Sequence, residues 1–187
     1  MIDQYIFGYG SLVNRDTHDY ANVFPARLNG WRRVWRHTLL RPVAYLSATR
    51  DPDCAIDGLI MGVSHPDPEL EEREHGYDRH CVDQNISHDL QDPISVEVYA
   101  VHHQKHGVPV DLLPVYLSYI DVVVQGYFKE YGETGVQNFF ETTDGWDAPI
   151  LDDRTTPHYQ RHTKLSADER SLTDHWLNQL AAKVKQL

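Results

Sequence analysis

The chain has 187 residues, of which 41% are hydrophobic and 24% are charged, and its formal net charge is −11. These values predict one globular domain over residues 1–187, with enough chain to bury a hydrophobic core. No apolar run approaches the ~20 residues of a membrane-spanning helix, and the first residues lack the basic and apolar regions of a signal peptide. An acidic chain is also a poor partner for nucleic acid or for an anionic membrane, so we expect neither partner.

Two cysteines, Cys54 and Cys81, are too few for a disulfide framework. A reducing compartment is the simplest environment for such a chain, so we expect a cytoplasmic protein. The sequence gives no indication of an oligomeric state.

The charges are distributed unevenly along the chain. Residues 1–50 contain seven arginines and three aspartates, whereas residues 51–100 contain two arginines and thirteen acidic residues. The basic segment could mark the site of a small anionic ligand, or its arginines could lie on strand faces exposed to water.

The first half of the chain has the patterns of strands. Residues 5–9 form a short aromatic and β-branched run that ends at Gly10, and residues 25–36 alternate apolar and basic side chains around Asn29-Gly30. Residues 43–49 and 55–63 then predict a hairpin. Its turn would be Arg50-Asp51-Pro52-Asp53, which has suitable turn residues.

Helical patterns dominate the rest of the chain. An acidic helix is predicted over 69–74, behind a cap at 64–68, and Gly76 would end it. A strand is predicted over 94–102, helices over 114–131 and 136–141, and a loop over 146–161. The last helix opens with a capping box at Ser166, and its apolar stripe is Leu172, Trp176, Leu180 and Val184. This order of elements predicts an α+β fold or a small mixed barrel.

Two segments could carry chemistry. In Tyr9-Gly10-Ser11-Leu12 the chain leaves the first strand at a glycine, so backbone N–H groups there could bind a carboxylate or an oxyanion, or the glycines could simply allow a tight turn. In the acidic helix, Glu71 and Glu74 share a face. A glutamate facing an apolar cavity would have a raised pKa suited to proton transfer, whereas the acids could equally complement the helix dipole.

The other candidates carry weaker signals. The histidines at 102, 103 and 106 are the densest group, but they match no zinc-ligand spacing. Ser11 lacks the G-x-S-x-G context of a nucleophilic serine. Tyr159 could line a pocket or could pack within its loop.

The ordered set of motifs resembles the gamma-glutamylcyclotransferase family, nearest to its ChaC-type branch and bacterial relatives. The resemblance rests first on Tyr9-Gly10-Ser11-Leu12 after the first strand and on Leu70-Glu71-Glu72-Arg73-Glu74 further along the chain. It implies a gamma-glutamylcyclotransferase-like α+β fold, with a small mixed β-barrel or sheet and packed helices. The other segments that agree are 26–33, 58–63, 142–146 and 149–154.

The resemblance also implies an activity. The α-amine of a small gamma-glutamyl substrate would attack its own γ-carbonyl, giving 5-oxoproline and a released amine or peptide. Glu74 would be the acid/base, and Tyr9, Gly10, Ser11 and Leu12 would hold the glutamyl α-carboxylate and amine. No metal and no organic cofactor is implied. Acidic neighbours could keep the Glu74 proton available by like-charge repulsion.

Three functions stay open at this level. The first is this enzyme, acting on glutathione, a gamma-glutamyl amino acid, a gamma-glutamyl amine or a gamma-glutamylated metabolite. The second is a binding module that keeps the same cavity without turnover. The third is an unrelated metal-dependent hydrolase built on the histidines.

Overall fold

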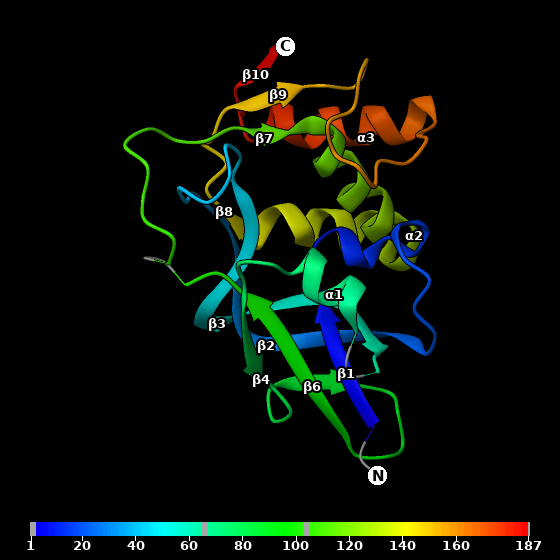
Figure 1. Cartoon of the computed structure of the whole chain (residues 1–187). Coiled ribbons are helices and arrows are strands. Elements are labelled where there is room, and N and C mark those ends of the chain that lie inside the picture. The colour runs from blue at the N-terminus through cyan, green and yellow to red at the C-terminus, as the bar shows by residue number, and fades with distance from the viewer. Residues whose placement is uncertain (1–2, 65–66, 103–104, 187) are drawn as a thin grey trace.

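The computed structural model describes residues 3–64, 67–102 and 105–186 (Figure 1). The helices are α1 Pro68–Arg73, α2 Leu117–Glu141 and α3 Ala167–Gln179, with two short 3-10 helices, η1 Ser11–Val13 and η2 Arg15–Thr17. The strands are β1 Asp3–Gly8, β2 Val23–Arg36, β3 Tyr45–Gly62, β4 Asp78–Cys81, β5 Ile86–His88, β6 Ile94–Ala100, β7 Val115–Tyr116, β8 Thr143–Asp144, β9 Ile150–Asp152 and β10 Val184–Gln186.

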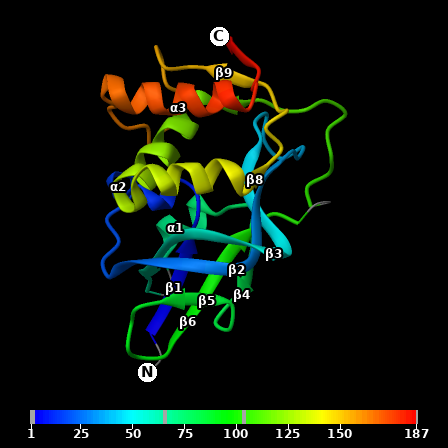
Figure 2. The same cartoon turned by 180° about the vertical axis from the view of Figure 1, so that it is seen from behind.

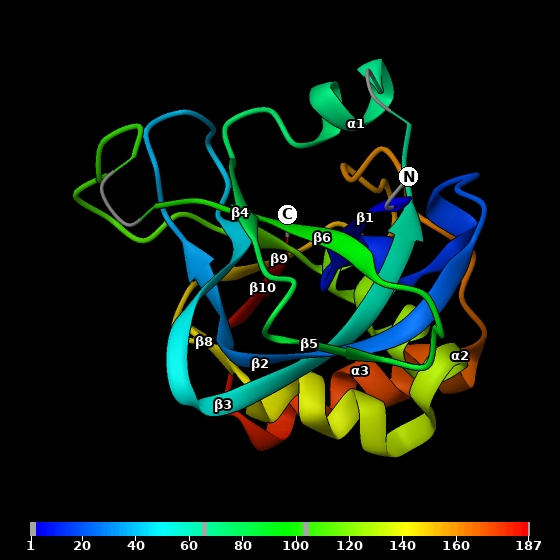
Figure 3. The same cartoon turned by 90° about the horizontal axis from the view of Figure 1, so that it is seen from below.

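The main sheet is mixed, with the strand order β4-β6-β1-β3-β2-β5 and with β8 added to β2. β1 pairs in parallel with β6 and in antiparallel with β3, so the first strand lies in the middle of the sheet. In the described part of the chain, β4 and β5 form two separate edges, and the strongly curved sheet is open rather than a closed barrel (Figure 3). The expected α+β class is confirmed.

Helix α2 packs on one side of this sheet, and α3 packs on α2, whereas α1 lies apart from both (Figure 3). α2 lies between the main sheet and a layer formed by α3 and the small sheet β10-β9-β7 (Figures 1 and 2). Fully buried side chains from both layers, including Ile60 of β3 and Tyr127 of α2, form the core between them. Burying an aliphatic or aromatic side chain of this size contributes roughly 1.5–3 kcal/mol.

The hairpin expected at 43–63 is wrong. β3 is one long strand from Tyr45 to Gly62, and its hairpin partner is β2, with which it pairs on both sides of residues 51–54. The predicted turn residues instead lie at a shift in register, where Asn29 faces Ala55 but Trp31 faces Arg50. Gly30 takes a positive φ of 76° there, so the turn-forming residues of both strands are used in a bulge.

The helices match the predicted patterns, with three corrections. The first is that Val115 and Tyr116, expected within the helix at 114–131, form β7, and α2 begins only at Leu117. α2 contains a break at Gly132, whose φ is 65°, so the two helices expected there are confirmed as segments either side of a kink. The Ser166 capping box is confirmed. Val184, assigned to the last helical stripe, lies instead in the exposed strand β10, and the expected loop at 146–161 contains β9.

No helix in the described ranges is both long and apolar enough to cross a membrane.

Candidate active site

The chain turns sharply where β1 ends, because two glycines allow close packing. A Cβ on Gly8 would lie 2.5 Å from the Leu12 Cβ, and a Cβ on Gly10 would lie 2.6 Å from the Tyr119 hydroxyl. The backbone then enters η1, whose first N–H groups have no acceptor within the helix. The Ser11 N–H lies near the Tyr119 hydroxyl and lowers the pKa of that phenol, against the larger effect of burial. We call residues 9–12 the β1 loop.

A buried arginine fixes this loop from behind. Arg33 of β2 is 1% exposed, and its Nε donates to the Tyr9 carbonyl oxygen at 3.0 Å. The Tyr127 hydroxyl donates to the same oxygen at 2.9 Å, and the Arg33 guanidinium lies 4.8 Å from the centre of the Tyr127 ring. On the pocket side, the Tyr9 hydroxyl donates to the Tyr99 carbonyl oxygen at 2.6 Å. The loop is therefore held on both sides by hydrogen bonds.

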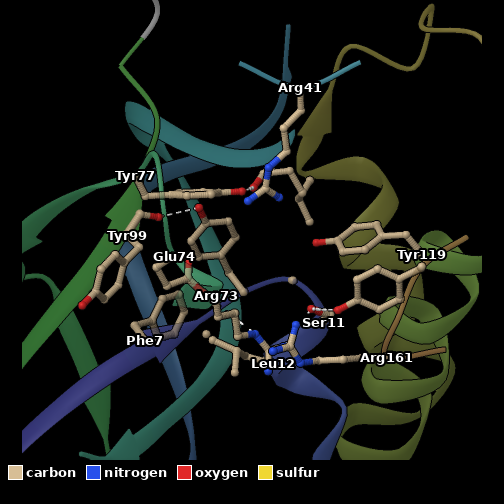
Figure 4. Close-up of a pocket in the computed structure, with 15 residues that line it drawn as sticks. Phe7, Ser11, Leu12, Arg41, Arg73, Glu74, Tyr77, Tyr99, Tyr119 and Arg161 are labelled. Carbon is tan, nitrogen blue, oxygen red and sulfur yellow. Dashed lines mark hydrogen bonds and ion pairs between the residues drawn. The ribbon is translucent and has the colours of Figure 1, made fainter. Parts of the chain in front are cut away.

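Helix α1 delivers Glu74. The Asp67 carboxylate caps its start by accepting from the Leu70 N–H at 3.0 Å, and the Leu70 side chain is fully buried. Glu74 is the residue at which the helix ends, and Gly76 follows it with a φ of 98°. The expected acidic helix and its glycine stop are confirmed. Since the chain turns away at this point, the Glu74 side chain is directed into the pocket (Figure 4).

The environment of Glu74 favours its protonated form. The side chain is 12% exposed, and burial raises its pKa from 4.5 to about 7 against the opposing effect of three arginine charges. Those arginines are Arg73, whose Nε lies 4.0 Å from Glu74 Oε1, Arg161 and Arg41. The like-charge repulsion expected from neighbouring acids is therefore wrong, because desolvation is the cause of the raised pKa and the nearby charges are positive.

One pocket of about 140 Å³ brings the predicted residues together. Glu74 lies on one side of it and the β1 loop on another, although the two segments are far apart in sequence (Figure 4). A second, larger pocket of about 590 Å³ adjoins it and shares several of its lining residues. The predicted members that line the inner pocket are Tyr9, Gly10, Ser11, Leu12 and Glu74.

The Ser11 hydroxyl links three parts of the pocket. Its Oγ accepts from Arg73 Nη2 at 2.9 Å and from the Tyr159 hydroxyl at 2.8 Å. Tyr159 also packs edge-on against Tyr119, with 5.0 Å between the ring centres. Of the two interpretations of Tyr159, the structure supports the one in which it lines the pocket.

A buried carboxylate holds the segment that carries Tyr159 and Arg161. Asp153 is 1% exposed. Its oxygens accept from the Ser118 N–H at 2.8 Å, from the Ser118 hydroxyl at 2.6 Å and from the His158 N–H at 2.8 Å. These bonds tie the segment after β9 to the start of α2, so it passes across the mouth of the pocket.

The arginines of the basic N-terminal segment divide between the two interpretations, since Arg27 is exposed on a strand face and Arg41 lines the pockets. Arg15, Arg27 and Arg32 form ion pairs with carboxylates, and Arg33 is buried behind the β1 loop. Of the seven, Arg41 lines the two pockets. The other positive charges in the pocket, Arg73 and Arg161, come from outside that segment. Arg73 lies in the motif of the acidic helix, which assigns it no role, and no motif marks Arg161.

The histidine group does not form a metal site among the residues that the structure describes, where no three His, Cys, Asp or Glu side chains are placed to hold an ion. His106 Nε2 instead lies 3.0 Å from the Gly76 carbonyl oxygen, next to the turn that follows Glu74. His103 lies outside the described residues. Both cysteines are free, and Cys54 is buried.

No protein-family model matches the sequence, and no curated protein matches it either. Solved structures do match. One described as a gamma-glutamyl cyclotransferase superimposes with a TM-score of 0.56 at 12% identity, over 91% of this chain and 98% of that one. The chain has the gamma-glutamyl cyclotransferase fold. The fold-level resemblance indicated by the sequence motifs is confirmed.

Two further structures share this cyclotransferase fold. An uncharacterised human protein superimposes with a TM-score of 0.57 at 13% identity, over 91% of this chain and 97% of that one. YkqA of Bacillus subtilis gives a TM-score of 0.53 at 18% identity, over 78% of this chain and 57% of YkqA. At such low identity the likeness concerns the fold, so the argument for function rests on the pocket.

Proposed function

We propose that this protein is a gamma-glutamylcyclotransferase, which converts a gamma-glutamyl compound into 5-oxoproline and a released amine or peptide. One observation carries the proposal. Glu74, a desolvated carboxyl with a pKa near 7, lines the same pocket as the β1 loop. The cyclotransferase fold supports it.

The β1 loop and its surroundings are suited to hold the glutamyl half of the substrate. Backbone N–H groups at the start of η1 and the proton of the Ser11 hydroxyl can donate hydrogen bonds to a carboxylate. Arg73 and Arg161 add positive charge on this side of the pocket (Figure 4). Such contacts would place the substrate's α-amine and γ-carbonyl next to each other.

Glu74 would then move two protons in succession, from the α-nitrogen to the leaving nitrogen. At neutral pH a group with a pKa near 7 is present in both forms, so it can accept a proton from the substrate's α-ammonium. The freed amine nitrogen attacks the γ-carbonyl carbon, a new C–N bond closes the five-membered ring, and the original amide C–N bond breaks. The ring nitrogen loses a second proton, and Glu74 passes both protons to the leaving nitrogen, which departs as an ammonium group, so no water and no redox partner is consumed.

The Tyr119 hydroxyl is placed to stabilise the intermediate. Burial raises its pKa above the usual value, so the phenol stays protonated. Within the described residues, this hydroxyl has no acceptor for its proton. It can therefore donate to the γ-carbonyl oxygen as negative charge develops there. Because the nucleophile is part of the substrate, positioning and charge stabilisation are the main demands on the protein.

The test is 5-oxoproline release from gamma-glutamyl compounds by the wild type and by Glu74→Gln. Gln keeps the size of Glu74 but cannot take a proton, so we expect kcat to fall on the order of 10²–10⁴-fold. Glu71→Gln is the matched control, since Glu71 is exposed on the same helix and lines neither pocket. Full activity in Glu74→Gln would refute its role. Binding of glutamate or 5-oxoproline without any turnover would favour a non-catalytic binding module.

A further inference from the structure

The outer pocket is where the leaving half of the substrate would lie. With the glutamyl half against the β1 loop and the γ-amide nitrogen within reach of Glu74, the rest of the leaving group must continue out of the inner pocket. The larger pocket of about 590 Å³ opens in that direction and shares Arg41, Tyr77, Tyr119 and Arg161 with the inner one. Its lining therefore selects the leaving group.

Arg41 is a cation at this border without an anionic partner. It is exposed, and none of the acidic side chains that the structure describes forms an ion pair with it. By contrast, Arg27 and Arg32 on β2 each pair with an aspartate. The Arg41 guanidinium stacks on the Tyr45 ring, with 5.0 Å to the ring centre. Stacking orients its planar donors, which then suit a carboxylate.

The pocket presents two separate positive regions. Figure 4 shows Arg161 beside Ser11 at one end and Arg41 beside Tyr77 at the other. Arg161 is on the side of the β1 loop, where the glutamyl α-carboxylate would bind. Arg41 is across the pocket, within the part shared with the outer chamber. A substrate with one carboxylate at each end would match both regions.

We propose that Arg41 binds a carboxylate on the leaving half, which makes the substrates gamma-glutamyl amino acids or peptides rather than gamma-glutamyl amines. This inference rests on the proposed function and specifies the substrate class. An amine leaving group would place no charge opposite Arg41, whereas an amino acid carries its carboxylate a few bonds from the scissile amide.

A matched pair of substrates isolates this carboxylate. Gamma-glutamyl-alanine and gamma-glutamyl-ethylamine differ only in that group, and 5-oxoproline release gives kcat/KM for each. We expect the wild type to prefer the alanine compound by about tenfold or more, the usual range for a charge-assisted hydrogen bond. The preference should shrink at high salt, because Arg41 is exposed.

Variants assign the preference to Arg41. Arg41→Gln should bring the ratio of the two kcat/KM values close to one, and Arg41→Lys should give an intermediate ratio, since lysine keeps the charge but loses the planar fork. Arg170→Gln is the control, as Arg170 is exposed on α3 and lines neither pocket. A general loss of stability would lower both rates and leave the ratio unchanged.

Each outcome is decisive. Equal rates in the wild type, or a preference that survives Arg41→Gln, would overturn the assignment of Arg41 while leaving cyclotransferase activity intact. Release of 5-oxoproline from neither compound, nor from a wider set of gamma-glutamyl compounds, would instead refute the proposed function and the inference with it.

Discussion

Glu74 experiences two opposing influences on its pKa. Burial raises the pKa to about 7, while Arg73, Arg161 and Arg41 lower it. The balance leaves a carboxyl that can both accept and return a proton near neutral pH. The arginines keep the Glu74 pKa from rising further, and under the proposed function they would also attract an anionic substrate.

The raised pKa of Glu74 has a consequence for stability. A carboxyl whose pKa is higher in the folded state than in the unfolded state favours folding at low pH, and this contribution is lost as the pH rises from 4.5 through 7. Glu74→Gln should therefore stabilise the protein by about 2 kcal/mol more at pH 8 than at pH 5. Denaturant unfolding of the wild type and the variant at pH 5 and at pH 8 measures this difference in stability. An equal stability change at the two pH values would show that the Glu74 pKa is not raised.

Tyr119 offers a second test that changes a single side chain of the pocket. Tyr119→Phe removes the proposed donor to the γ-carbonyl oxygen, so kcat should fall on the order of tenfold to a hundredfold, with less effect on KM. Tyr99→Phe is the control, because the Tyr99 hydroxyl interacts with Arg79 and points away from the other labelled pocket residues (Figure 4). Equal effects of the two changes on kcat would exclude the role of Tyr119.

Among the elements, the segment after β9 depends most on tertiary contacts. Asp153 accepts three hydrogen bonds from Ser118 and His158. Both carboxylate oxygens of Asp153 accept hydrogen bonds, whereas an asparagine side chain has only one acceptor oxygen. Asp153→Asn should therefore destabilise the fold by about 1–3 kcal/mol.

The same change should also loosen Tyr159 and Arg161 at the pocket. We expect KM for a gamma-glutamyl amino acid to rise more than kcat falls, as measured in steady-state assays well below the melting temperature. Asp111→Asn, on an exposed loop, should change neither value. An unchanged KM in Asp153→Asn would show that Asp153 stabilises the fold without positioning the pocket.

Local patterns predicted some elements better than others. The Ser166 capping box and the glycine after Glu74 are short-range signals, and both mark real helix ends. Residues 50–53 also have the side chains of a turn, but β3 pairs with β2 on both sides of them. This pairing overrides the local preference for a hairpin turn. Local propensity cannot reveal such pairing, because the stabilising contacts come from a distant strand.

At the scale of the whole molecule, the net charge of −11 says little about the pocket. The uneven charge was informative only in part. Most of the N-terminal arginines serve the fold, whereas Arg41, Arg73 and Arg161 converge from three distant segments. The sequence motifs located the β1 loop and Glu74, while the residues that surround them depend on how the chain folds.

The central claim is an intramolecular cyclisation, and product analysis in ¹⁸O-labelled water tests it most directly. Gamma-glutamyl-alanine should yield unlabelled 5-oxoproline and alanine in equal amounts, with no glutamate, because the α-amine and not water attacks the γ-carbonyl. Glutamate carrying one ¹⁸O atom would show that water is the nucleophile, and would contradict the account.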